Sequence, residues 1–182
     1  MGGMRGVRVI AGELGGRRLR APRGAATRPT AERVREAVFS MLGDVRDLDV
    51  LDLFAGSGAL GIEALSRGAA HATFVERAPA ALDALRANLD ALGLGARARV
   101  VAGDARSALR GPGKYDLVFI DPPYAAAGEL TVALAAMLPE VLAAGARVVS
   151  ESDRRAPLEL AMAVRRERRY GDTLIRIHEQ VP

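Results

Sequence analysis

Hydrophobic and polar positions follow a regular order from residue 48 to residue 150. Short apolar runs, which are typical of buried strands, take turns with longer segments whose apolar residues recur at helical spacing. This alternation predicts an α/β fold with a doubly wound, mostly parallel sheet. We expect strands near 49–54, 72–76, 98–102, 115–120 and 146–150, and helices near 59–67, 78–92, 105–110 and 128–143.

The two ends of the chain follow a different pattern. Residues 7–11 and 17–20 alternate like two short strands around a Glu-Leu-Gly-Gly turn, which predicts an N-terminal hairpin. After a loop rich in Pro, Gly and Thr, Thr30 is a candidate N-cap for a helix over 31–42. Two extended runs around Gly171-Asp172 predict an antiparallel hairpin that closes the sheet.

The segment from Val50 to Gly61 carries the strongest local signal. An apolar run to Phe54 is followed by Ala55-Gly56-Ser57-Gly58, and helical spacing begins at Ala59. A buried strand, a glycine turn and a helix N-terminus together form a nucleotide-binding corner. The glycines spell G-x-G-x-x-G, which alone is weak evidence and also suits a dinucleotide-dependent dehydrogenase.

Two carboxylates favour a different ligand. Asp52 lies inside the strand, where it would repel a pyrophosphate but suit an ammonium group. Glu76 ends the next strand, at about the spacing at which an acidic residue reaches a ribose diol. A ligand with an amine, a ribose and no phosphate is S-adenosylmethionine. We rank the alternative, in which Asp52 caps a helix, second, because capping residues normally sit at the helix start.

A third strand also ends in an acidic residue. Asp104 could accept a hydrogen bond from an adenine amino group, while Ala105 presents its backbone N–H. Asp104 could equally cap the helix that follows, and both interpretations remain open.

The fourth strand runs into Asp121-Pro122-Pro123-Tyr124. The residue before a proline is pushed out of helical geometry, and the prolines stiffen the loop. Such a loop suits an exocyclic amine on a flat ring: Asp121 and the Pro122 carbonyl would accept its two hydrogens, and Tyr124 would stack on the ring. Because strand ends host ligand sites in this architecture, we favour this interpretation over a plain turn.

Composition and charge narrow the range of partners. The chain has no cysteine, which excludes disulfides, thiolate metal sites and a cysteine nucleophile, and its two histidines lie far apart. No apolar run is long enough to cross a membrane and no signal-peptide pattern is present, so we expect a cytoplasmic protein. The net charge is +4, and arginines crowd the N-terminal stretch, which favours a polyanion as partner over a solvated tail. These arginines are Arg5, Arg8, Arg17, Arg18, Arg20, Arg23 and Arg28.

Taken together, these motifs resemble a known family. The Asp52–Gly58 segment and Asp121-Pro122-Pro123-Tyr124 are similar to those of class I S-adenosylmethionine-dependent amino-methyltransferases. Four further segments resemble the RsmD family in particular: 9–12, 16–19, 28–36 and 170–173. Its members have a seven-stranded Rossmann-like core with an N-terminal hairpin used for RNA, and they methylate N2 of a guanine in bacterial 16S ribosomal RNA.

The resemblance, combined with the strand-end residues above, assigns expected roles to individual side chains. The catalytic residues would be Asp121, Pro122 and Tyr124. The cofactor-binding residues would be Asp52, Phe54, Gly56, Gly58, Glu76, Arg77, Asp104 and Ala105. The substrate-binding residues would be Arg17, Arg18, Arg28 and Thr30.

The same resemblance predicts the organisation and the partners. Residues 1–45 would form an RNA-binding extension, and residues 46–182 the catalytic domain that binds S-adenosylmethionine. The partner would be 16S rRNA or an assembly intermediate of the small ribosomal subunit, bound by a monomer without metal or membrane. Two alternatives remain: a DNA amino-methyltransferase that uses the same loop, and a non-catalytic RNA-binding assembly module.

Overall fold

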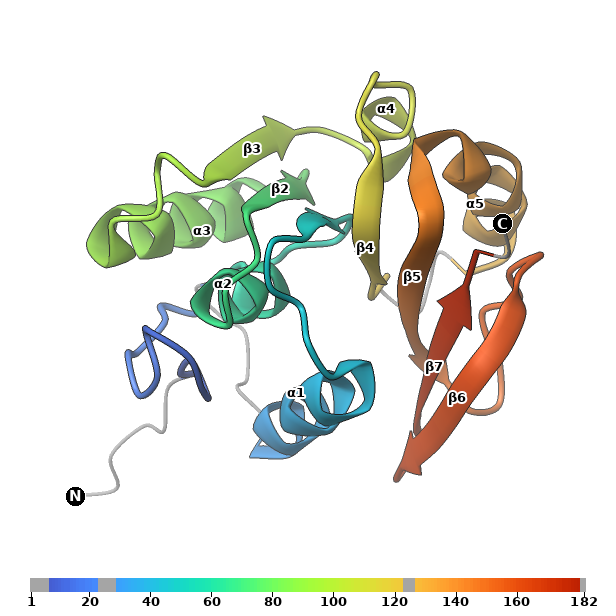
Figure 1. The fold of residues 1–182 in the computed structure, drawn as a ribbon, viewed down its shortest axis with the longest axis horizontal. Coiled ribbons are helices and arrows are strands. Elements are labelled where there is room, and N and C mark those ends of the chain that lie inside the picture. Colours follow the sequence, from blue (N-terminus) through green and yellow to red (C-terminus); the bar gives the residue numbers. More distant parts are fainter. Residues whose placement is uncertain (1–6, 23–28, 123–126, 181–182) are drawn as a thin grey trace.

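A computed structural model describes residues 7–22, 29–122 and 127–180. Its centre is a seven-stranded sheet with the order β3-β2-β1-β4-β5-β7-β6 (Figure 1). Strands β1 to β5 are parallel, whereas β7 runs antiparallel to both β5 and β6. The strands are β1 (Asp49–Asp52), β2 (His71–Glu76), β3 (Ala98–Ala102), β4 (Tyr115–Ile120), β5 (Leu142–Asp153), β6 (Ala163–Tyr170) and β7 (Thr173–Glu179).

Helices cover both faces of this sheet, as a doubly wound fold requires. The helices are α1 (Pro29–Leu42), α2 (Ala59–Ser66), α3 (Pro79–Leu92), α4 (Ala105–Ala108) and α5 (Ala127–Val141). On one face, Val38, Ile62 and Leu85 of α1, α2 and α3 share a buried cluster with Phe119 of β4. On the other face, Leu134 of α5 packs in a second cluster. Neither these helices nor any other described segment forms an apolar helix of membrane-spanning length.

The predicted fold class is confirmed, and the largest difference in bounds concerns β5. We expected a strand near 146–150, but β5 extends from Leu142 to Asp153. At the C-terminal end the added length has a physical reason: β7 pairs with β5 from Arg147 to Asp153, which lies opposite Thr173. The antiparallel ladder therefore continues the strand beyond the last residue that pairs with β4, Ser150.

The N-terminal hairpin forms where the alternating pattern placed it. Arg8 and Arg18 form an antiparallel bridge, and Val9 donates its N–H to the carbonyl of Arg17 at 2.9 Å. Val9 and Leu19 are buried in the same cluster as α1 and α2, so the hairpin has no core of its own. The division of the chain at residue 45 remains a prediction about function.

Candidate active site

The carboxyl ends of the parallel strands bring the predicted acidic residues to one edge of the sheet. Asp52 ends β1, Glu76 ends β2 and Asp121 follows β4, and these three are close enough to interact electrostatically. Because β1 lies between β2 and β4 in the sheet, Asp52 stands at the centre of the group. The strand order, which no local motif reveals, therefore assembles residues that are up to 69 positions apart in the sequence (Asp52 to Asp121).

The glycine turn between β1 and α2 is shaped by two close approaches and one open position. Gly58 has a φ of +86°, and a Cβ there would lie 2.5 Å from Cδ1 of Leu85. A Cβ on Gly61 would lie 2.3 Å from Cε1 of Phe74, so this glycine lets α2 pack directly on β2. Gly56, with a φ of +55°, would meet nothing within 4 Å among the described residues. The turn is thus tight on its protein side and leaves space on its outer side.

Protein carboxylates occupy the backbone amides of this corner. Glu76 accepts hydrogen bonds at 2.8 Å from the N–H groups of Gly56, Arg77 and Ala78. Gly61 donates its N–H to Oδ2 of Asp52 at 3.1 Å. Dinucleotide-binding folds present such amides to a pyrophosphate. Here the amides of Gly56 and Gly61 already hold anions of the protein, which disfavours a phosphate ligand.

Asp52 is buried, and its surroundings disfavour its charged form. Only 1% of the residue is exposed, and burial, together with the neighbouring charges of Asp121 and Glu76, raises the pKa of Asp52 to about 7. Its bond from Gly61, the third residue of α2, also realises the capping interpretation that we ranked second. A cation beside Asp52 would offset the charge repulsion, as the ammonium of the expected cofactor would.

Asp104 caps α4 and also stands beside the corner. It accepts the N–H of Arg106 at 2.9 Å, and Ala105, which is buried, begins the helix. The side-chain hydrogen bond from Arg106 lowers the pKa of Asp104, as does the guanidinium of Arg77 at 3.9 Å. The capping interpretation is therefore realised, while a carboxylate oxygen still faces Arg77. Phe54, also expected at the cofactor, is half-buried against the core on the α5 side of the sheet.

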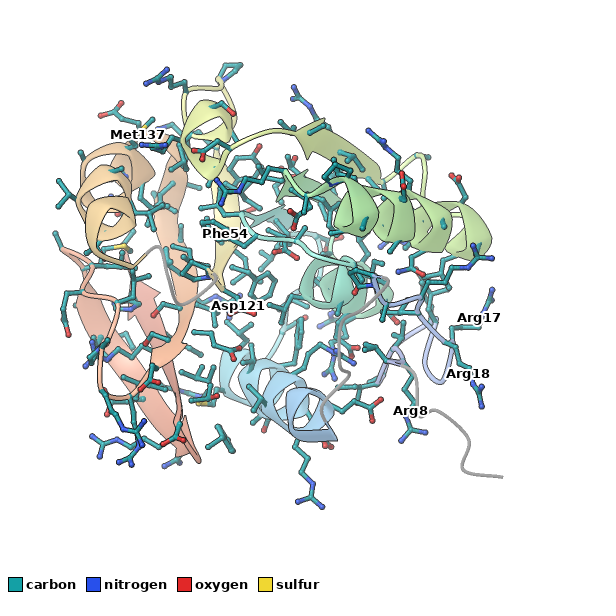
Figure 2. The ribbon with its side chains drawn as sticks, turned by 180° about the vertical axis from the view of Figure 1, so that it is seen from behind. Arg8, Arg17, Arg18, Phe54, Asp121 and Met137 are labelled. Atoms are coloured by element: carbon teal, nitrogen blue, oxygen red, sulfur yellow. The ribbon has the colours of Figure 1, made fainter. Side chains whose placement is uncertain are left out.

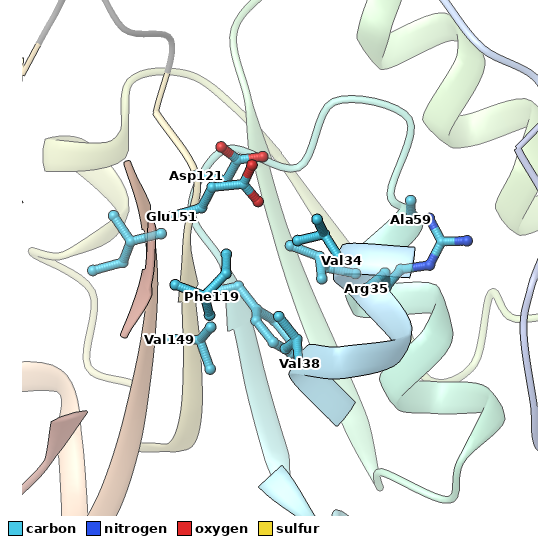
Figure 3. A pocket seen from close by; sticks show the side chains of 11 residues that line it. Val34, Arg35, Val38, Ala59, Phe119, Asp121, Val149 and Glu151 are labelled. Atoms are coloured by element: carbon cyan, nitrogen blue, oxygen red, sulfur yellow. The ribbon is translucent and has the colours of Figure 1, made fainter. Parts of the chain in front are cut away.

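A pocket opens beside Asp121, between α1 and the carboxyl ends of β4 and β5 (Figure 3). It encloses about 610 Å³, part of which is open to solvent. Pro122, which follows Asp121, is buried. Pro123 and Tyr124 lie outside the described residues. The walls of the pocket are mainly apolar and include Val34, Val38, Phe119, Val149 and Ile175.

Sequence reasoning missed a second carboxylate in this pocket, that of Glu151. Figure 3 shows the carboxylates of Asp121 and Glu151 side by side, with the guanidinium of Arg35 pointing away from them. Water reaches the Asp121 side chain, yet the surrounding protein raises its pKa, and burial together with the charge of Asp121 raises the pKa of Glu151. An acidic residue directly after the expected end of a strand was the only signal available.

The expected substrate-binding arginines lie away from this pocket. Figure 2 shows Arg17 and Arg18 at one end of the molecule, directed outward and away from Asp121. Arg17 donates a hydrogen bond to the carbonyl of Ala91 at 3.0 Å, and Arg18 is exposed. Arg28 lies outside the described residues. Thr30 is the second residue of α1, which begins at Pro29, so it is not the N-cap that the sequence predicted, and only its backbone position is described.

Three buried polar side chains, which sequence reasoning also missed, attach the hairpin to the core. Glu63 of α2 accepts the N–H groups of Ile10 and Ala11 at 2.7 and 3.0 Å. Asn88 of α3 donates to the carbonyls of both Arg20 and Ser57, which joins the strand leaving the hairpin to the glycine turn. The third, Ser66, accepts the N–H of Leu14.

Known proteins are similar to this chain over most of its length. The family model of conserved hypothetical protein 95 matches residues 7–179. The Bacillus subtilis protein YlbH, whose name assigns it provisionally to the rRNA methyltransferases, is 39% identical over 96% of this chain and 99% of its own length. Ribosomal RNA small subunit methyltransferase D of Escherichia coli K12 is 48% identical over a stretch that covers 65% of this chain and 60% of that enzyme.

A solved structure shares the fold over nearly the whole chain. The Escherichia coli protein yhhF, described with similar reserve as a methyltransferase, superposes with a TM-score of 0.83 and 37% identity, covering 96% of this chain and 98% of that one. The family match and the near-complete alignment with YlbH confirm the resemblance inferred from the motifs. The chain belongs to the conserved hypothetical protein 95 family, the RsmD family of methyltransferases.

Proposed function

We propose that this protein transfers a methyl group from S-adenosylmethionine to the exocyclic N2 amine of a guanine in small-subunit ribosomal RNA. The observation that carries the proposal is the position of Asp121: it lies between a glycine corner suited to a cationic nucleoside and a pocket that would admit one base. The name of the Escherichia coli relative, an rRNA small subunit methyltransferase, supports the substrate class.

The corner fits the proposed cofactor in charge and in space. S-adenosylmethionine would supply a methyl group activated by a sulfonium, together with a ribose and an ammonium. Glu76, held in place by three backbone amides, would accept hydrogen bonds from the ribose hydroxyls. Asp52 would face the cationic part, and Asp104, beside Ala105, would face the adenine. The open space at Gly56 would let the ligand approach the backbone.

Asp121 and the carbonyl of Pro122 would hold the two hydrogens of the target amine. An aryl amine is a weak nucleophile because its lone pair is delocalised into the ring. Two fixed acceptors would turn the lone pair toward the methyl group, and the carboxylate would stabilise the positive charge that develops on nitrogen during transfer. Asp121 need not remove a proton before the methyl group moves. Tyr124 would stack on the base.

The target guanine must leave any helix before it can enter. Its N2 amine faces the minor groove of a duplex, so the base must be flipped out or already unpaired. Val34 and Val38 of α1 and Phe119 of β4 would line its apolar faces. Arg17 and Arg18 would bind RNA phosphates beyond the pocket, as an arginine-rich hairpin suits.

A direct test uses small-subunit particles and naked 16S rRNA from a strain that lacks this gene. We expect the purified protein to transfer a labelled methyl group to at least one of the two substrates. Mass spectrometry of the digested RNA should then identify N2-methylguanosine. A different methylated nucleoside, or transfer to DNA in place of RNA, would contradict the proposal. Calorimetry should show binding of S-adenosylmethionine and none of NAD.

A further inference from the structure

We propose that Glu151 is the residue that selects guanine, because its carboxylate accepts the ring N1–H while Asp121 accepts the neighbouring N2–H. The inference rests on the proposed function and adds the group that would distinguish guanine from other bases. It starts from a gap in the mechanism. Asp121 and the Pro122 carbonyl suit any exocyclic amine, so they cannot by themselves favour one base.

The sheet places the two carboxylates at equivalent positions on neighbouring parallel strands. Ile120 of β4 pairs with Ser150 of β5, so the next residue on each strand is Asp121 and Glu151. Side chains alternate between the two faces of a sheet, so both carboxylates lie on the face that α1 covers. Phe119 and Val149, two residues earlier on the same strands, line the pocket on that face too. Glu151 therefore points into the same pocket as Asp121, as Figure 3 shows.

No structural interaction among the described residues explains why position 151 carries a carboxylate. Among the described residues, no hydrogen bond or ion pair to its side chain is present, whereas the neighbouring Ser150 bonds His178 at 3.1 Å. The pocket walls around it are mainly apolar, and the cation among the residues that line the pocket, Arg35, binds Glu63 and the carbonyl of Arg8 instead. Two ionised carboxylates side by side are unfavourable, so burial and the charge of Asp121 raise the pKa of Glu151, and a ligand that places donors between the pair would favour the ionised form.

Guanine is the common base whose pattern of donors fits this pair. Its amine lies beside a protonated ring nitrogen, so its edge presents N2–H and N1–H next to each other. The adenine amine lies beside the bare nitrogen N1, and the cytosine amine beside the bare nitrogen N3. Either base would turn a lone pair toward Glu151. The resulting repulsion, with one carboxylate left unsatisfied, is the kind of mismatch that discriminates strongly between similar substrates.

The test compares two target bases in one RNA, a fragment of small-subunit rRNA that the wild-type protein methylates. One RNA carries guanine at the target and the other carries 2-aminopurine, which keeps the N2 amine but has no hydrogen on N1. Single-turnover methyl transfer is measured for the wild type, for Glu151→Gln and for the control Glu140→Gln, which is exposed on α5. Calorimetry with S-adenosylmethionine shows for each variant that the fold and the cofactor site are intact.

We expect the wild type and Glu140→Gln to favour guanine over 2-aminopurine by about 10- to 100-fold. Glu151→Gln should reduce this preference to a few-fold or less, because an amide can turn its N–H toward the bare N1. An unchanged preference in Glu151→Gln, with guanine still methylated, would overturn the role of Glu151 alone. If the wild type methylates guanine and 2-aminopurine at equal rates, the two carboxylates do not select guanine, and this inference fails while the proposed function stands.

Discussion

Carboxylates occupy two regions of the molecule: the glycine corner, with Asp52, Glu76 and Asp104, and the pocket with Asp121 and Glu151. The two regions differ in how many hydrogen bonds the protein donates to these carboxylates. In the corner, Glu76 and Asp52 accept four backbone N–H bonds between them, and Asp104 is bonded to Arg106. In the pocket, Glu151 accepts none from the described residues. Corner carboxylates are therefore part of the folded framework. The carboxylates of the pocket would remain available to the proposed substrate, and their mutual repulsion destabilises the free protein.

This contrast predicts that substitutions in the pocket mainly change the rate of methyl transfer, whereas substitutions in the corner mainly change the affinity for the cofactor and the free energy of unfolding. Asp121→Asn in the pocket should lower single-turnover methyl transfer by roughly 10²–10³-fold, because one preorganised electrostatic partner of the transition state is lost. The free energy of unfolding should stay the same or rise slightly, because a raised pKa shows that the carboxylate is unfavourably placed.

Asp116→Asn is a matched control near the opposite end of the same strand. Its carboxylate accepts the N–H of Asp49 at 2.9 Å and is remote from the pocket, so methyl transfer should stay near the wild-type rate. A near-wild-type rate for Asp121→Asn would show that the amine is held by some other group. Thermal unfolding and rapid-quench kinetics on the same preparations provide both measurements.

In the corner, Asp52→Asn should weaken the affinity for S-adenosylmethionine by about tenfold, since a charge facing the cationic ligand is lost. The pKa of Asp52 is raised to about 7, and a cation favours the ionised form. Wild-type affinity should therefore increase as the pH rises from 6 to 8, and Asp52→Asn should flatten this dependence. Calorimetry across that range is the measurement. Asp83→Asn, exposed on α3, should retain the wild-type pH dependence.

The same group predicts how the stability of the free protein depends on pH. The pKa of Asp52 in the folded chain lies above its ordinary value of 3.8, so the folded protein binds more protons between about pH 4 and pH 7. Its contribution is fully present below pH 4 and is lost as the pH rises through 7. We expect a loss of about 1–3 kcal/mol over that window. Urea unfolding should show a smaller loss for Asp52→Asn, and an equal loss would assign the effect to other groups.

Much of the fold could be predicted from local pattern, but the contrast between corner and pocket could not. The pattern of apolar residues located the parallel strands because each is a buried apolar run. The glycine turn correctly predicted the start of the helix that follows it. Glu151 was missed because β5 was expected to end at residue 150, and only the antiparallel partner β7 extends it. Glu63 was missed because its spacing to Arg67 is that of an ordinary surface pair, whereas the docked hairpin buries it completely.

The buried Glu63 also decides how the RNA-binding role of the hairpin should be tested. Removing residues 1–20 would leave Glu63 without the amides of Ile10 and Ala11, and it would uncover the core where Val9 and Leu19 pack. An uncompensated buried charge destabilises a fold strongly, so such a truncation would confuse loss of binding with unfolding. Substitution of exposed arginines avoids this problem.

The smallest expected effect therefore comes from the double variant Arg17→Gln with Arg18→Gln. Both side chains are exposed on the hairpin, so each would contribute one phosphate contact in water, and affinity at physiological salt should fall only about 3- to 10-fold. The slope of log affinity against log salt should decrease by about one to two, because fewer counterions are released. Cofactor affinity and the rate at saturating RNA should not change, which separates this surface from both carboxylate regions. Arg110→Gln with Lys114→Gln removes equal charge beside α4 and should leave the slope intact. If both double variants change it equally, RNA responds to the overall charge and the hairpin has no special role.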